Sequence, residues 1–278
     1  MKSMTYQEMI DVQLNLLDVF HDFCVKHKLN YSLNYGTLIG AIRHKGLIPW
    51  DDDVDVAMPR EDFDRFFDLY NNENNPKYKV LNHRIRPEID TKIGYLIDFD
   101  TAITTEMDTT IKEWKCLHID IYPIDLLPQN RYFSKFFFYM TRLLNKVIYL
   151  RTLRINVPKG TRPFYKQFIV VLFRVLLFWV NVDCFLEILI SLSEKFKKPA
   201  CEFTEGDNAS ILCEFDTPKV FPARYFSEYT ETLFNGKKYS IIKEYDKYLR
   251  LWYGDYMKLP SEADRHPKRD KFTKYLWK

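Results

Sequence analysis

A run of four aspartates within five residues is the feature of this chain with the clearest chemical meaning. The run reads Asp51-Asp52-Asp53-Val54-Asp55. Carboxylates this close repel one another and raise one another's pKa, and proteins usually neutralise such a group with a divalent cation. If the run is a strand, its alternation places Asp51, Asp53 and Asp55 on one face, with Asp52 and Val54 on the other. The spacing predicts a metal site, with Mg²⁺ as the expected ion and Mn²⁺ as the alternative.

A second strand with an acidic residue is expected further along the chain. Residues 117–122 alternate between apolar and polar side chains, which places His118, Asp120 and Tyr122 on one face. Two carboxylates on one strand and a third on its neighbour can hold Mg²⁺ against the phosphates of a nucleotide, and the third can take a proton from an attacking hydroxyl. We therefore predict Asp53, Asp55 and Asp120 as catalytic metal ligands, with Asp51 as an outer ligand.

Glycines precede the aspartates, and they suggest where phosphate groups bind. Three of the eight glycines in the chain fall within residues 36–46. A turn at Gly36 and Thr37, before a helix, leaves backbone N–H groups that can approach phosphate oxygens. Arg43 and Lys45 lie one short loop away and are predicted to hold the phosphates, or else to offset the aspartates in a salt-bridge network. Trp50, beside the acidic run, is the fifth predicted substrate-binding residue.

The stretch that carries these residues resembles the signature of the LicD family. That family groups bacterial phosphocholine transferases with fukutin-type ribitol-phosphate transferases. The matching stretches are YGTLIGAIRHKGLIPWDDDVDVAMPR at 35–60, LHIDIYPID at 117–125, FNG at 234–236, YDKYL at 245–249 and YGDYM at 253–257. The resemblance implies an α+β fold of the nucleotidyltransferase type, with a mixed sheet, flanking helices and a helical insertion.

The resemblance also implies an activity: transfer of phosphocholine from CDP-choline to a sugar hydroxyl of a teichoic-acid or surface-polysaccharide precursor, with release of CMP. The acceptor is expected to be a lipid-linked glycan. Aromatic side chains bind quaternary ammonium groups, and Trp114, Trp252, Tyr253 and Tyr256 are candidates for that role. Three alternatives remain: transfer of ribitol or glycerol phosphate from a CDP donor, nucleotidyl transfer that releases pyrophosphate, and a non-enzymatic membrane-surface binding module with a structural metal.

The hydrophobic pattern predicts the elements that position these residues. Helices are expected over residues 5–28, from Pro59 onward and over 241–253, with a helical stretch over 131–198 that breaks at 158–160. Strands are expected over 31–35, 53–58, 78–81, 93–99 and 117–122, the last ended by Pro123. Asp125 is expected to cap or turn the chain beyond that proline.

The charge of the chain divides it into regions of opposite sign. Between Arg131 and Val182 there are ten Lys or Arg residues and no acidic residue. Residues 131–199 carry a net charge of +10, against −7 for the rest, and they are rich in Phe, Leu and Ile. We therefore predict a catalytic core over 1–130, a basic aromatic helical subdomain over 131–199, and a C-terminal part over 200–278 that packs back on the core. The helical subdomain is expected to pack against the sheet.

The basic aromatic segment suggests peripheral contact with anionic lipid, although it equally fits an ordinary helical subdomain with an apolar core. Its longest uncharged apolar stretch, residues 175–182, is far shorter than the roughly 20 residues of a membrane span. No module that reads nucleic-acid bases is visible, so nucleic acid is not an expected partner. The first residues lack the apolar core of a secretory signal, and the five cysteines lack CxxC spacing. A cytoplasmic protein with reduced, buried thiols is expected, with a place at the inner face of the membrane.

Overall fold

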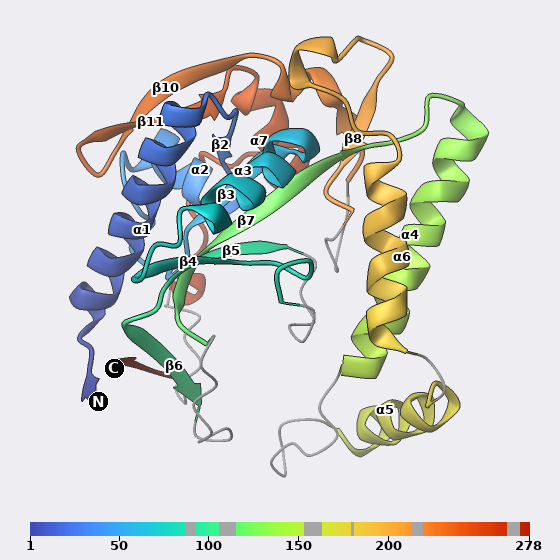
Figure 1. The fold of residues 1–278 in the computed structure, drawn as a ribbon, viewed down its shortest axis with the longest axis horizontal. Coiled ribbons are helices and arrows are strands. Elements are labelled where there is room, and N and C mark those ends of the chain that lie inside the picture. The colour runs from blue at the N-terminus through green and yellow to red at the C-terminus, as the bar shows by residue number, and fades with distance from the viewer. Residues whose placement is uncertain (87–92, 106–114, 153–162, 179–180, 213–218, 266–272) are drawn as a thin grey trace.

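A mixed β-sheet organises the protein (Figure 1). The computed structural model describes residues 1–278 except 87–92, 106–114, 153–162, 179–180, 213–218 and 266–272. The main path of the sheet runs β2-β3-β7-β5-β4, and only the β3–β7 pair within it is parallel. These strands are β2 (Ser32–Leu33), β3 (Asp55–Pro59), β4 (Tyr78–Leu81), β5 (Gly94–Asp98) and β7 (Leu117–Leu126). The fold is therefore α+β with a mixed sheet, as predicted.

Two helices, α1 (Tyr6–His27) and α3 (Arg60–Asn72), pack on the sheet and on each other through aromatic side chains. Phe66 of α3 lies against Phe20 and Phe23 of α1, with ring centroids 4.9 and 5.5 Å apart. Helix α1 begins at a complete capping box, in which Thr5 Oγ1 accepts from the Glu8 N–H and Glu8 accepts from the Thr5 N–H. Both helices begin within one residue of their predicted starts, because a cap and a proline mark those positions.

The N-terminus and the C-terminus lie side by side (Figure 1), because β1 (Lys2–Ser3) pairs with β12 (Thr273–Trp277), which also pairs with β6 (Thr101–Thr105). A hairpin of β10 (Tyr229–Phe234) and β11 (Lys237–Ile242) turns at Asn235 and Gly236, whose positive φ angles of 49° and 83° suit a tight two-residue turn. Other elements around the sheet are α2 (Tyr35–Arg43), α7 (Tyr245–Tyr253), β8 (Asn208–Ser210), β9 (Phe221–Pro222) and the short 3₁₀ helices η1 (Ala200–Glu202), η2 (Ala223–Phe226) and η3 (Glu262–Asp264).

Three helices follow the sheet core: α4 (Arg131–Thr152), α5 (Phe164–Leu176) and α6 (Val182–Glu194). Helices α4 and α6 stand next to each other, and α5 lies across one end of them (Figure 1). Leu144 and Ile148 of α4 pack with Leu186 and Leu189 of α6 in a small apolar cluster of their own. No helix within the described ranges combines the length and the apolar character that a membrane-spanning segment needs.

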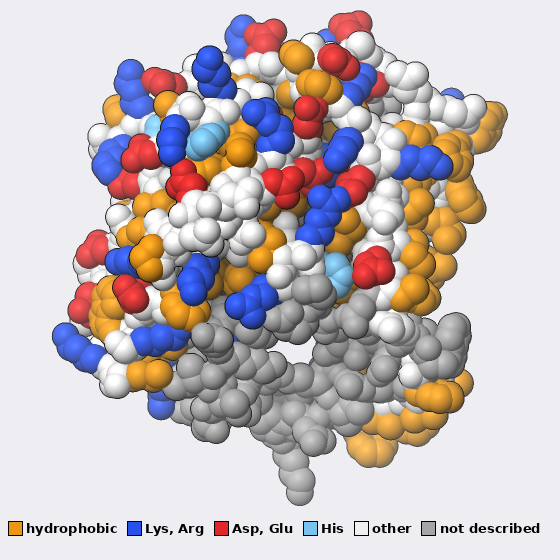
Figure 2. Space-filling model, in the orientation of Figure 1, with side chains coloured by type: hydrophobic (Ala, Val, Ile, Leu, Met, Phe, Trp, Pro, Cys, Tyr) orange, Lys and Arg blue, Asp and Glu red, His pale blue; other side chains and the backbone are white. Residues whose placement is uncertain are grey.

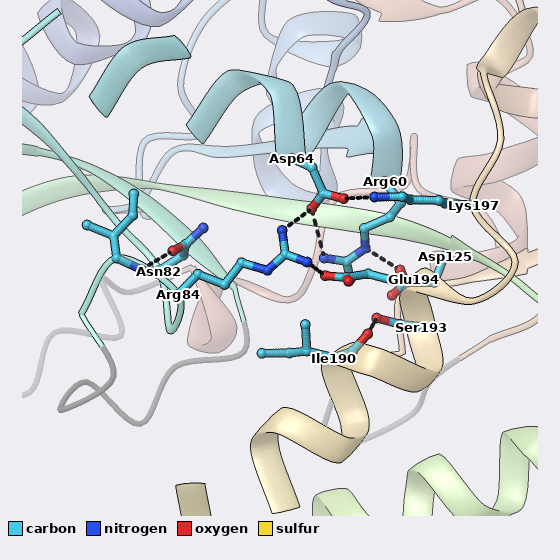
Figure 3. Close-up of polar contacts among 10 residues, drawn as sticks. Arg60, Asp64, Asn82, Arg84, Asp125, Ile190, Ser193, Glu194 and Lys197 are labelled. Atoms are coloured by element: carbon cyan, nitrogen blue, oxygen red, sulfur yellow. Dashed lines mark hydrogen bonds and ion pairs between the residues drawn. The ribbon is translucent and has the colours of Figure 1, made fainter. Parts of the chain in front are cut away.

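A network of ion pairs joins the end of α6 to the sheet (Figure 3). At its centre the buried Arg60, at the start of α3, donates to Asp125 of β7 at 2.6 Å. From the side of α6, Glu194 pairs with Arg84, and Lys197 donates to Asp64 of α3. The helical segment thus packs against the sheet, as predicted, through partly exposed ion pairs as well as apolar side chains.

Several predicted elements differ from the structure. Strand β7 runs to Leu126, so Pro123 does not end it and Asp125 is a buried ion-pair partner within the strand. Pro123 fits there because the pairing with β5 ends at Ile121, so the missing N–H costs no bond to that strand. Helix α7 begins at Tyr245 and not at 241, since Ile241 and Ile242 belong to β11.

The prediction that the cysteines are buried is correct for two of the four cysteines that the structure describes. Cys24 and Cys116 are buried free thiols, whereas Cys184 and Cys201 are exposed. Cys184 lies in α6 and Cys201 in η1, away from the main core around the sheet. Cys213 lies outside the described residues.

Candidate active site

The parallel pairing of β3 with β7 brings two of the predicted catalytic carboxylates together. Asp55 and Asp120 are direct partners in the register of the two strands, and the pairing begins one residue earlier, where the Asp120 N–H donates to the Val54 carbonyl at 2.9 Å. On β7, Ile119 and Ile121 point into the apolar core, and the residues between them point to the opposite, half-buried face. This alternation places the Asp120 carboxylate on the same side of the sheet as His118 and Tyr122, as predicted.

The acidic run itself is mostly a loop. Strand β3 begins only at Asp55, so the predicted strand, which begins at residue 53, starts two residues too early. Asp51, Asp53 and Asp55 nevertheless line one cavity, which agrees with their predicted common side. Val54 is fully buried in the core, also as predicted. A loop, and not a strand, therefore places Asp51 and Asp53 on the same side as Asp55.

Asp52 departs from the prediction that it faces away from its neighbours. One carboxylate oxygen each from Asp51, Asp52 and Asp53 can be chosen so that all three lie within 4.8 Å of one another. A loop, unlike a strand, can turn consecutive side chains toward the same point. Three such oxygens suit a hard divalent cation, whose preferred ligands are carboxylates, carbonyls and water. Asp52 therefore joins the candidate ligands, while Asp55 and Asp120 lie outside this trio of oxygens and their predicted role as metal ligands stays a prediction.

Two side chains of α1 hold the acidic loop in place. The Tyr6 hydroxyl donates to the Asp51 carbonyl at 3.2 Å, and the buried Gln13 amide donates to the Asp52 carbonyl at 2.9 Å. Gly36 of α2 also fixes its position, because a Cβ at residue 36 would lie 2.2 Å from Asp51 Oδ2. The glycine therefore lets the Asp51 carboxylate lie against the first turn of α2.

The predicted turn at Gly36 and Thr37 is part of a helix. Helix α2 begins at Tyr35, two residues earlier than expected, and Gly36 lines the cavity. Thr37 is buried and does not line it; its hydroxyl accepts from the Asp55 N–H at 2.9 Å. Thr37 therefore positions the start of β3, and its predicted contact with substrate phosphate does not match this geometry.

Asp120 occupies a half-buried position with partners on both sides. Burial raises the pKa of its carboxyl group, and the nearby charge of Asp53 raises it further, whereas His118 and the Tyr122 hydroxyl lower it. His118 Nε2 lies 3.5 Å from Asp120 Oδ1, and His118 Nδ1 lies 2.7 Å from the Cys116 carbonyl. His118 is thus oriented by the backbone toward Asp120. A carboxylate whose pKa is raised is a better proton acceptor than an exposed one.

The cavity beside the carboxylates has a volume of about 1110 Å³. Helices α2 and α7 and the chain after α7 form its other walls. Tyr35, Tyr122 and Trp252 make an aromatic cluster in its lining, with Tyr35 perpendicular to both neighbours at centroid distances of 5.1 and 5.3 Å. Trp50 lines the cavity as well, where the guanidinium of Arg265 lies 6.0 Å from its ring centroid.

The two predicted cationic residues lie in different places. Arg43 lines the cavity, and its guanidinium donates to the Tyr256 carbonyl at 2.6 Å and to the Lys258 carbonyl at 3.5 Å. Burial lowers the pKa of Arg43, as does the charge of Arg265. Lys45, with a positive φ of 58°, instead borders a separate hollow beside β10 and β11, and its carbonyl accepts from the Asn235 N–H. Lys45 does not line the cavity that Arg43 lines, and its predicted role in holding the phosphates stays a prediction.

Part of the cavity wall was not predicted as part of the site. Tyr35, Lys258, Asp255 and Asp264 line it, and none of them was named as a site residue. The matching motif at 253–257 was the signal that could have indicated this wall. Of the predicted aromatic candidates, Trp252, Tyr253 and Tyr256 line the cavity, and Trp114 lies outside the described residues.

Comparison with known proteins agrees with the resemblance seen in the motifs. Residues 28–149 match the family model described as LicD/FKTN/FKRP, nucleotidyltransferase domain. The chain is 28% identical over 278 aligned residues to the lipopolysaccharide cholinephosphotransferase LicD of Haemophilus influenzae, and the alignment covers 96% of this chain and 97% of the relative. An uncharacterised protein of Rickettsia typhi is 34% identical over 112 residues, which cover 40% of this chain and 33% of that protein.

Proposed function

We propose that this chain is a phosphocholine transferase that acts on a cell-surface polysaccharide, because residues 28–149 match the model of the LicD/FKTN/FKRP nucleotidyltransferase domain. The proposed donor is CDP-choline, and the proposed acceptor is a sugar hydroxyl of a lipopolysaccharide or teichoic-acid precursor. The full-length similarity to a lipopolysaccharide cholinephosphotransferase supports both the group that is moved and the class of acceptor.

One observation carries the chemistry: the carboxylates of Asp51, Asp53 and Asp55 line the same cavity as a cluster of aromatic rings. A CDP-choline donor needs both features, since its diphosphate requires a divalent cation and its trimethylammonium group binds to the faces of aromatic rings. The cluster of Tyr35, Tyr122 and Trp252 is the proposed site of the choline group.

In the proposed reaction, the acceptor oxygen attacks the phosphorus that carries the choline, and the bond from that phosphorus to the bridging oxygen of CMP breaks. Asp53, Asp55 and Asp120 are the proposed ligands of Mg²⁺ or Mn²⁺, with Asp51 and Asp52 beside them. The ion supplies positive charge that stabilises the diphosphate as CMP leaves. Asp120 is the proposed acceptor for the proton of the hydroxyl, and CMP leaves with the electron pair of the broken bond.

Cationic side chains support the binding of the donor. Arg43 and Lys258 line the same cavity as the carboxylates, and Arg43 also holds the chain after α7 through its bonds to two carbonyls. Both residues are proposed to offset the negative charge of the diphosphate, Arg43 through a fork of N–H donors and Lys258 as a point charge.

A donor-release assay tests this proposal. The protein is incubated with Mg²⁺ and a lipid-linked glycan acceptor, with CDP-choline, CDP-ribitol or CDP-glycerol in separate reactions, and CMP is measured. Release of CMP from CDP-choline supports the proposal, and release only from CDP-ribitol or CDP-glycerol indicates that the phosphate of that alcohol is the group transferred. In a further reaction with a nucleoside triphosphate in place of the CDP donor, release of pyrophosphate indicates nucleotidyl transfer instead. No product from any donor counts against an enzymatic role.

Substitutions in the acidic run separate catalysis from a structural metal. Asp55→Asn should lower the rate of transfer by roughly 10³-fold or more, as expected for loss of a principal charged group in the active site. Asp68→Asn removes an exposed aspartate on α3, away from the cavity, and should leave the rate unchanged. If Asp53→Asn lowers the melting temperature while transfer stays intact, the metal is structural and the proposed catalytic role of Asp53 is refuted.

A further inference from the structure

Helices α4 and α5 expose large apolar side chains on faces that no part of the described chain covers. Helix α4 is apolar on two sides: Phe137, Leu144 and Ile148 are buried, whereas Phe136 and Tyr139 face outward at 61% and 64% exposure. With Tyr132 and Leu143, also exposed, the outward residues follow the 3–4 spacing of a single helix face. A soluble helix normally places polar residues on that face.

Helix α5 shows the same property more strongly. Phe164, Phe168, Leu172 and Val175 form one face of the helix, and their exposed fractions are 88%, 60%, 43% and 63%. Val170 is its one buried apolar residue among those whose side chains the structure describes. Figure 2 shows the hydrophobic side chains gathered along the edge of the molecule formed by the helical segment and again at its lower end. Exposed apolar side chains gathered in this way mark an interaction site.

The charge of the same segment identifies the kind of partner. Residues 131–182 carry ten Lys or Arg residues and no acidic residue, and Lys135 and Lys146 of α4 are exposed beside its outer face. A second copy docked through this same face would bring two strongly positive segments together, which charge repulsion disfavours. A bilayer with anionic headgroups offers both an apolar interior for the aromatic side chains and negative charge for the basic ones.

We propose that the outer faces of α4 and α5 dock on the surface of an anionic membrane. Helix α5 has 13 residues and is about 20 Å long at 1.5 Å per residue, too short to span a bilayer but suited to lie in its interface. The aromatic residues insert among the headgroups and upper acyl chains, and the lysines contact the lipid phosphates. This surface is separate from the carboxylate cavity and goes beyond the proposed transferase function; it would bring the enzyme to acceptors held in the membrane.

Vesicle flotation tests the proposal with the intact chain. Wild-type protein should float with vesicles of phosphatidylcholine that contain about one third phosphatidylglycerol, and bind at least about tenfold more weakly to vesicles of phosphatidylcholine alone or at high salt. The variant F136S/F164S/F168S should bind the anionic vesicles more than about tenfold more weakly, because three inserted rings are lost. The matched control V25S/V220S/L233S replaces exposed apolar residues outside 131–199 and should bind like the wild type.

Three results would overturn the proposal: no binding of wild-type protein to anionic vesicles, full binding by the triple variant, or a dimer in sedimentation analysis that the triple variant dissociates while vesicles remain unbound. The last result assigns the surface to a second copy. Failure of the proposed transferase function is distinguished separately, since Asp55→Asn should bind vesicles normally. The triple variant should still release CMP with a water-soluble glycan acceptor.

Discussion

Removal of the positive partner from the buried pair of Arg60 and Asp125 should reveal how strongly that pair constrains the fold. The two side chains are 7% and 1% exposed, and Arg60 Nε lies 2.6 Å from Asp125 Oδ1. Arg60→Met keeps the aliphatic stem and deletes the charge. Asp64, the second neighbour of Arg60, keeps Lys197 and Arg84 as partners, so the main consequence falls on Asp125.

The size of the effect follows from the charge that is left behind. A carboxylate buried without its partner typically costs 3–5 kcal/mol. The protein can avoid that cost by protonating Asp125, whose ordinary pKa is 3.8. Protonation of such a group costs about 4 kcal/mol at pH 7 and about 1.6 kcal/mol at pH 5, at 1.36 kcal/mol for each pH unit. We therefore expect Arg60→Met to lose 3–4 kcal/mol of unfolding free energy at pH 7, and less than about 2 kcal/mol at pH 5.

The direction of the pH effect follows from the pKa of Asp125. Burial raises this pKa above its ordinary value even in the wild type, against the opposing effect of Arg60, and loss of Arg60 raises it further. Above pH 3.8 the folded variant then binds a proton that the unfolded chain has released, so its stability increases as the pH falls toward that value. The wild type should show a weaker trend of the same sign.

Urea unfolding followed by tryptophan fluorescence at pH 7 and pH 5 measures both quantities. The double variant R60M/D125L should recover most of the loss, because a well-packed apolar pair often replaces a buried ion pair without cost. Lys26→Met removes an exposed ion pair between α1 and Glu73 and serves as the control, with an expected change below about 1 kcal/mol. An Arg60→Met penalty under 1 kcal/mol at pH 7, or equal penalties at the two pH values, would refute the reasoning.

Three further variants address the site and the elements around it. Gly36→Ala should displace the Asp51 carboxylate, which lies 2.2 Å from the position of the new Cβ, and weaken Mn²⁺ binding roughly tenfold in calorimetry, while Gly206→Ala, with open space around it, should not. Thr5→Ala breaks the capping box of α1 and should cost about 1 kcal/mol in urea unfolding. Tyr248→Phe removes the donor that reaches Asn34 Oδ1 in the core at 3.0 Å, and a loss of about 1–2 kcal/mol is expected, with an unchanged melting temperature as the contrary result.

The elements that could be predicted from the sequence are those that local signals determine. The starts of α1 and α3, the whole of β4 and the core of β5 follow from caps, a proline and apolar alternation. Strands β6 and β12 were not predicted, because each is held by a partner about 170 residues away in the sequence, as the pairing of Thr105 with Thr273 illustrates. Ile241 and Ile242 fit a helix as well as a strand, and only the hairpin with β10 decides between them.

The part of the candidate site that could be predicted from the sequence is the placement of its carboxylates on one side of the sheet. Asp55 and Asp120 are partners in the register of two adjacent strands. The alternation of side chains that places both on one face can be read from the sequence. The position of Lys45 depends on a residue with left-handed backbone conformation, and the position of the Asp52 side chain depends on the path of a loop. Neither feature produces a periodic pattern of apolar and polar residues, so the sequence does not predict it. The aromatic wall from Tyr35 and Trp252 arises where α2 and α7, distant in sequence, meet at the cavity.

The attachment of the acidic loop has a consequence for ligand binding. Tyr6 and Gln13 bind its carbonyls, Gly36 allows its first carboxylate to lie close, and Gly46 leaves room for the Asn235 side chain, which accepts from the Leu47 N–H. A segment fastened from so many directions has already given up most of its conformational entropy during folding. Association with a cation or a nucleotide then requires little additional ordering, so more of the interaction energy is expressed as affinity.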